Sequence, residues 1–133
     1  MTLIMLVATL ALLVVGAVPG VASALATTCY GGEDVYQVGV AANTWTDWFY
    51  DTTSTRCHDL NVKITDHPAN CSVFVDAWYY KPGTGWVDGA HDDFWFSPNQ
   101  WVTPLTDLKD GVQVAARFYF RCSDASTRIH IAS

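Results

Sequence analysis

Apolar and polar residues alternate along most of the chain after residue 26. In residues 59–65 Leu60, Val62 and Ile64 alternate with polar side chains, and residues 112–122 keep the same period of two. Such a period places successive side chains on opposite faces of a β-strand. Both segments therefore predict strands with one face in a core.

Further strands are expected where β-branched and aromatic residues lie between turn-forming residues. They are predicted at residues 35–41, 44–50, 71–80, 86–87 and 128–132, and residues 100–106 would form an edge strand because they contain Pro104. The pattern is typical of an all-β sandwich or small barrel. We expect a single small antiparallel β-sandwich of seven to eight strands.

The first residues follow a different pattern. Residues 3–18 are almost wholly apolar, the first charged residue is Glu33, and small residues end at Ala26 in an Ala-x-Ala pattern. This arrangement predicts a signal peptide at residues 1–26, with an uncleaved membrane anchor as the alternative. Residues 27–133 would then form one secreted, extracellular domain with no membrane contact after cleavage.

Four cysteines, Cys29, Cys57, Cys71 and Cys122, indicate a two-disulfide framework in a small secreted domain. Cys71 shares a predicted strand face with Val73 and Val75, and Cys122 lies on the apolar face of its strand. We therefore pair Cys71 with Cys122 and, by elimination, Cys29 with Cys57. The other two connectivities stay open at this stage.

Seven basic and thirteen acidic residues give a net charge of −6, which disfavours a nucleic-acid partner. All the acidic residues except Glu33 are Asp, a residue favoured in turns. The segment 88–93 holds three of them and His91. A calcium loop is one interpretation, but a solvated acidic loop is preferred, and no metal or cofactor is expected.

Cys57-His58-Asp59 is similar to the catalytic pair of secreted phospholipases A2. Those enzymes carry the pair on a long helix, whereas here a strand pattern follows. We predict no catalytic residue, and a small secreted hydrolase is kept only as an alternative.

The aromatic residues carry the clearest functional signal. A strand with consecutive aromatic residues must place some on each face, so some rings are expected at the surface, where Trp and Tyr form binding patches. The alternative is that a second sheet covers them. The candidate binding residues are Trp45, Trp48, Tyr50, Trp78, Tyr80, Trp86, Trp95 and Trp101.

Three segments resemble secreted actinobacterial β-sandwich proteins of the tendamistat type, which inhibit α-amylases: Cys57 with residues 60–63, Cys71, and residues 116–122. The family's inhibitory Trp-Arg-Tyr is absent, so no inhibitory residue is carried over. Small exported proteins of similar size and style also serve as adaptors in antibacterial toxin particles.

These observations favour a secreted, non-enzymatic protein-binding module, as an adaptor subunit of an extracellular assembly, including a toxin complex, or as an inhibitor of a secreted hydrolase. Its expected partner is another secreted protein. A carbohydrate-binding module with exposed aromatic residues is the main alternative.

Overall fold

The computed structural model describes residues 29–90 and 92–133, so the expected signal peptide lies outside the described residues. Ten strands occur in these ranges, with a short helical turn at residues 29–31. No helix there is long and apolar enough to cross a membrane. The strands are β1 (Asp34–Val40), β2 (Thr44–Trp45), β3 (Phe49–Thr52), β4 (Leu60–Thr65), β5 (Val73–Lys81), β6 (Gly85–Asp88), β7 (Phe94–Phe96), β8 (Val102–Leu105), β9 (Gln113–Phe120) and β10 (Asp124–Ala132).

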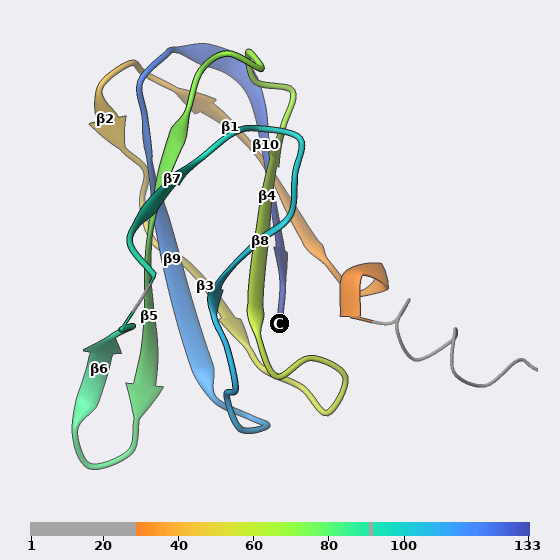
Figure 1. Cartoon of the computed structure of the whole chain (residues 1–133), viewed down its shortest axis with the longest axis vertical. Coiled ribbons are helices and arrows are strands. Elements are labelled where there is room, and N and C mark those ends of the chain that lie inside the picture. Colours follow the sequence, from red (N-terminus) through yellow and green to blue (C-terminus); the bar gives the residue numbers. More distant parts are fainter. Residues whose placement is uncertain (1–28, 91) are drawn as a thin grey trace, which may run out of the picture.

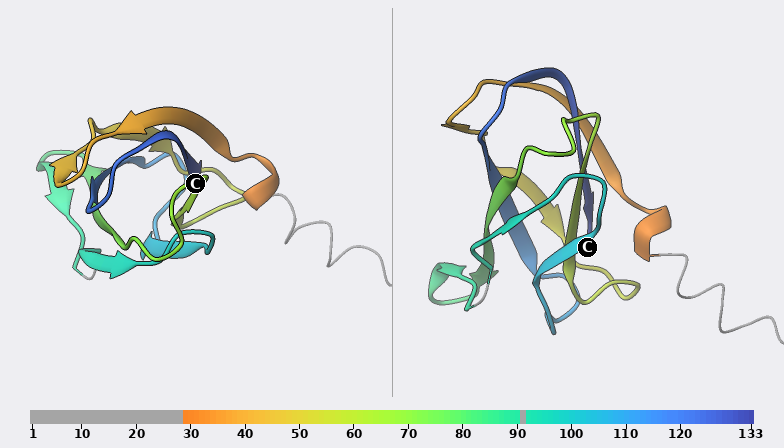
Figure 2. Two further views of the ribbon diagram at one scale, coloured as in Figure 1. Left: turned by 90° about the horizontal axis from the view of Figure 1, so that it is seen from above. Right: turned by 45° about the horizontal axis from the view of Figure 1, so that its top comes forward.

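The strands form two antiparallel sheets that pack as the layers of a sandwich (Figure 1). Sheet A has the order β1-β10-β4-β8. Sheet B is built on the β9–β5 pair, with β2 and β3 along one side of it and β6 and β7 along the other. Seen from one end, the sheets curl around the core (Figure 2). The predicted all-β sandwich is confirmed.

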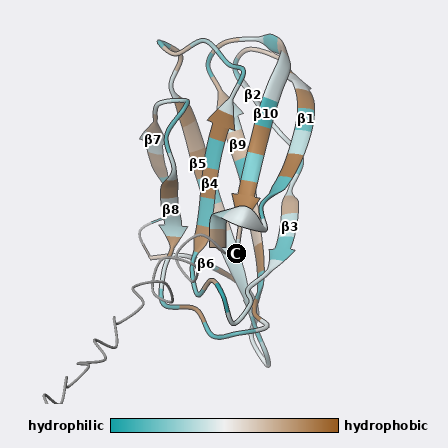
Figure 3. Ribbon diagram, turned by 90° about the vertical axis from the view of Figure 1, so that its right-hand side faces the viewer, coloured by the Kyte–Doolittle hydropathy of each residue, from teal (hydrophilic) through white to brown (hydrophobic). Residues whose placement is uncertain are grey.

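Alternation along the strands builds the core. Val62 and Ile64 of β4, Val75 of β5 and Phe118 of β9 are fully buried between the sheets. Apolar and polar bands alternate along β4 and β10 (Figure 3). Burying each such aliphatic or aromatic side chain contributes about 1.5–3 kcal/mol.

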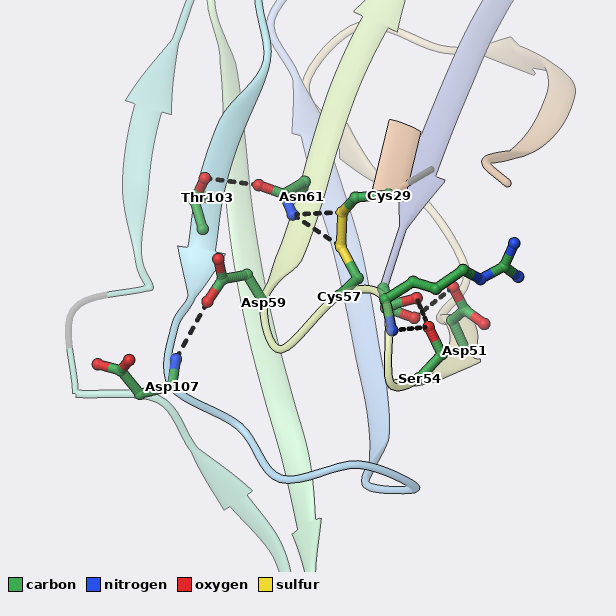
Figure 4. The surroundings of a disulfide bond; sticks show 10 residues. Cys29, Asp51, Ser54, Cys57, Asp59, Asn61, Thr103 and Asp107 are labelled. Atoms are coloured by element: carbon green, nitrogen blue, oxygen red, sulfur yellow. Dashed lines mark hydrogen bonds between the residues drawn. A yellow bond between two sulfur atoms is a disulfide. The ribbon is translucent and has the colours of Figure 1, made fainter. Parts of the chain in front are cut away.

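Both expected disulfides, Cys29–Cys57 and Cys71–Cys122, are present. The second joins the start of β5 to the end of β9, so it cross-links neighbouring strands of sheet B. The first attaches the N-terminal helical turn beside β4, where the Asn61 side chain lies between Thr103 and the two sulfur atoms (Figure 4). A native cross-link of this kind contributes about 2–4 kcal/mol.

Sheet B is interrupted on both sides at the same level. The strand expected at residues 44–50 is divided into β2 and β3, so the prediction of one continuous strand was wrong. This division, together with β7, where no strand was expected, brings the total to ten. Between them the Thr46 hydroxyl accepts the Phe118 N–H at 3.0 Å. On the opposite side, between β6 and β7, the Asp92 carboxylate accepts the Ala77 N–H at 3.2 Å. Side-chain oxygens thus replace strand carbonyls as hydrogen-bond acceptors.

Candidate binding face

Seven of the eight predicted binding residues lie on the outer side of sheet B. Together with Phe74 and Tyr119 they form a surface that we call the aromatic face. Exposure of its outermost rings ranges from 38% for Trp86 to 60% for Tyr50. Its members are Trp45, Trp48, Tyr50, Phe74, Trp78, Tyr80, Trp86, Trp95 and Tyr119.

Strand register explains why these rings gather. Residues directly opposite one another in an antiparallel pair share a face, and Phe74 lies opposite both Trp95 and Tyr119. Trp86 lies opposite Tyr80 in the same way. The even-numbered residues of β5 point outward while Val73, Val75 and Ala77 enter the core.

One ion pair lies in the middle of this face. Arg117 of β9 is opposite Asp76 of β5, and its Nε donates a hydrogen bond to the carboxylate at 2.7 Å. The other carboxylate oxygen accepts the Trp78 indole N–H at 2.7 Å. The Arg117 guanidinium also lies 4.5 Å from the Trp45 ring centre and 4.7 Å from that of Trp48. The pair therefore connects three indoles through charge-assisted and cation–π contacts.

The rings divide into two groups on either side of this ion pair. Trp45, Phe74, Trp95 and Tyr119 contact one another edge to face, with Arg121 placed 4.0 Å from the Trp95 ring centre. The second group surrounds Ala115, whose small side chain leaves a hollow of about 210 Å³. We call it the aromatic hollow; its lining residues are Trp48, Tyr50, Trp78, Trp86 and Ala115.

A group of carboxylates borders the aromatic face. One oxygen each of Asp76, Asp88, Asp92 and Asp93 lies within 4.8 Å of the others, an arrangement that could hold a hard cation. The preferred interpretation of residues 88–93 as a solvated loop is wrong for Asp92, which is 2% exposed and accepts the backbone N–H groups of Ala77 and Gly89. His91 lies outside the described residues.

Burial and charge repulsion change the acidity of this group. Burial is the main cause that raises the pKa of Asp92 to about 6, and the charges of Asp93 and Asp88 raise it further. Burial also raises the pKa of Asp93, with Asp76 and Asp88 adding to the shift and Arg117 opposing it. Asp92 is therefore part-protonated near neutral pH.

The eighth candidate, Trp101, lies away from the aromatic face. It precedes β8 on the outer side of sheet A, where its ring contacts Tyr30 and lies beneath the ammonium group of Lys63 at 4.6 Å. The structure therefore divides the predicted residues between two surfaces. Phe74, Tyr119 and Arg117 were missed, although their alternation within β5 and β9 placed them on the outward side.

The other candidate residues from the sequence, Cys57, His58 and His67, make contacts within the fold. Cys57 is in a disulfide, and the exposed His58 lies 2.8 Å from Asp110. His67 is buried, and its Nδ1 lies 2.9 Å from the Thr127 hydroxyl.

Comparisons with protein-family models, with curated proteins and with solved structures found no match to this chain.

Proposed function

We propose that this chain is an exported, non-enzymatic module that binds another exported protein through the aromatic face. The observation that carries the proposal is the set of aromatic rings on the outer side of sheet B, on both sides of Arg117, which no other described segment of the chain covers. Tyr50, Tyr80 and Trp86 project furthest on one side of Arg117. Trp, Tyr and Arg dominate the binding energy of protein interfaces, and these residue types make up this face.

The geometry favours a protein partner over a polysaccharide. The rings offer no flat platform on which a row of sugar rings could stack, because Trp48 and Trp78 are inclined at 76° and Tyr80 and Trp86 at 74°. Steeply inclined rings present edges and hollows suited to individual side chains. Roles as an adaptor subunit or as an inhibitor of a secreted hydrolase both fit such a surface.

The test is affinity capture from the culture medium of the producing organism. Replacing Tyr50 and Trp86 together by serine should abolish recovery of a defined partner, because both side chains project from the aromatic face. Val35→Ser is the matched control, since Val35 is 49% exposed on the outer side of sheet A. Retention of the protein on insoluble polysaccharide without a protein partner would contradict the proposal.

The identity of the captured protein separates the two roles. An inhibitor should reduce the activity of a recovered hydrolase in proportion to the amount added. An adaptor should instead remain at fixed stoichiometry within a larger assembly on size-exclusion chromatography.

A further inference from the structure

The aromatic hollow is shaped by a small residue among large ones. Ala115 of β9 lies opposite Tyr50 of β3 on one side and opposite Trp78 of β5 on the other. Its methyl group forms the floor, while Trp48 and Trp86 complete the walls. The Trp48 and Trp78 planes are inclined at 76°, and those of Tyr50 and Trp86 at 59°. The rings therefore enclose a volume from several directions.

Negative charge lies directly beside this hollow. Asp88 is opposite Trp78 in the β5–β6 pair, which places both side chains on the outer face. Asp76 accepts the Trp78 indole N–H. These two carboxylates belong to the group of four whose oxygens lie within 4.8 Å, and Arg117 pairs with only one of them, Asp76. The rim is consequently electronegative.

The aromatic face already binds cations of its own chain. Arg117 lies over Trp45 and Trp48, and Arg121 lies over Trp95. Among the described residues, no lysine or arginine lies over the rings of Trp78 or Trp86. Trp48, the third indole of the hollow, already has Arg117 over its ring, so the ring faces of Trp78 and Trp86 and the neighbouring carboxylates are what remain to stabilise a further cation.

We propose that the aromatic hollow is a receptor for an organic cation, supplied by a lysine or arginine side chain of the protein partner. This inference rests on the proposed function and names the chemistry of the partner's anchor. The alkyl part of such a side chain would contact the rings, and its charge would lie toward Asp88. The net charge of −6 on the chain favours the approach of a basic partner.

The first experiment uses small probes at constant ionic strength. Tetramethylammonium chloride should shift the indole N–H NMR signals of Trp48, Trp78 and Trp86 at millimolar concentration. The neutral tert-butyl alcohol, of similar shape, should bind roughly five- to tenfold more weakly because it lacks the cation–π term. Equal binding of the two probes, or no binding of tetramethylammonium, would overturn the proposal.

Variants localise the binding site. Ala115→Leu should abolish tetramethylammonium binding by filling the hollow, and Trp86→Ala should abolish it by removing a wall without the risk of overpacking. Trp95→Ala is the matched control, because Trp95 has similar exposure and also lies in a strand paired with β5. Asp88→Asn should weaken binding several-fold. Loss of binding in Trp95→Ala but not in Trp86→Ala would exclude the hollow.

The outcome separates this inference from the proposed function. If tetramethylammonium fails to bind while partner capture still requires Tyr50 and Trp86, the cation receptor is wrong and the protein-binding face stands. If the probe binds in the hollow but no partner is captured, the site stands as a cation site and the proposed function is wrong.

Discussion

The outer faces of the two sheets differ although both arise from the same alternation. On sheet A the outward side chains are mostly polar and pair with one another: Thr65 and His130 are 2.7 Å apart, and the N-terminal segment reaches across to place Glu33 3.3 Å from His130. On sheet B the outward side chains are mostly rings around one ion pair. Alternation determines which residues point away from the core. Whether those outward side chains are polar or aromatic determines whether the face is well solvated or can bind a partner.

The largest expected effect comes from breaking the central ion pair of the aromatic face. Arg117→Leu would leave Asp76, whose side chain is 9% exposed, beside three other carboxylates without its cation. Removing one partner of a buried pair costs about 3–5 kcal/mol, and we expect the lower end because Arg117 is itself 35% exposed. Urea unfolding at pH 7 would measure the loss.

The matched control is Arg128→Leu on sheet A. Arg128 and Asp66 also form an ion pair, at 3.2 Å, but both side chains are about half exposed. An exposed pair is worth about 1 kcal/mol or less. Similar losses for the two variants would show that the Arg117 pair is not buried among the rings.

The second-largest expected effect comes from removing the Cys29–Cys57 disulfide, which holds the N-terminal helical turn beside sheet A. Replacing Cys29 and Cys57 by serine releases the N-terminal turn, and the free energy of unfolding should fall by about 2–4 kcal/mol. Faster hydrogen exchange at residues 30–35 should accompany it, whereas the indole N–H NMR signals of the tryptophans on the aromatic face should be unchanged. A shift of those signals would mean that the two faces are coupled through the core.

Whether the sequence predicts the buried face of a strand depends on the residues on its two faces. For β4 the alternation of aliphatic with polar residues identified the buried face, and the faces of Cys71 and Cys122 led to the correct pairing. For β5 both faces are apolar, because Phe74, Trp78 and Tyr80 alternate with Val73 and Val75. Periodicity separates the two sets but does not tell which one enters the core; in the structure Val73 and Val75 are fully buried, and Tyr80 is exposed.

The interruptions of sheet B could not be predicted from local pattern. Residues 44–50 have good strand propensity throughout, but Thr46 offers a hydroxyl that competes for the Phe118 N–H, a partner more than seventy positions away. The buried position of Asp92 depends in the same way on Ala77 in a neighbouring strand. Trp101 was grouped with the other aromatic residues because composition carries no information about the sheet to which a ring belongs.

The third prediction tests the buried carboxylate at the border of the aromatic face. The pKa of Asp92 is raised to about 6, so the stabilisation from this group is present below its ordinary pKa near 4 and is lost as pH rises through 6. Asp92→Asn keeps an oxygen for the Ala77 and Gly89 N–H groups but is neutral. It should stabilise the protein by on the order of 2 kcal/mol at pH 8 and by almost nothing at pH 4.

Thermal unfolding between pH 4 and pH 8 measures this effect, with the exposed Asp47→Asn as the control for a general loss of negative charge. A uniform gain at all pH values for Asp92→Asn would contradict the raised pKa.

The smallest expected effect concerns His67, beside sheet A. Its contribution to stability changes with pH in the direction opposite to that of Asp92. Burial lowers the pKa of His67 below 6.5, partly offset by the charge of Asp124, and its Nε2 has no hydrogen-bond partner among the described residues. The neutral imidazole therefore stabilises the fold above pH 6.5, and this contribution is lost as pH falls through the lowered pKa. His67→Gln can keep the contact with Thr127 and should reduce the loss of stability between pH 7 and pH 5. The contribution of Asp92 to stability increases as pH falls over part of this interval, so the two substitutions should change the pH dependence in opposite directions. If His67→Gln loses as much stability toward pH 5 as the parent protein, the burial of His67 does not control its titration.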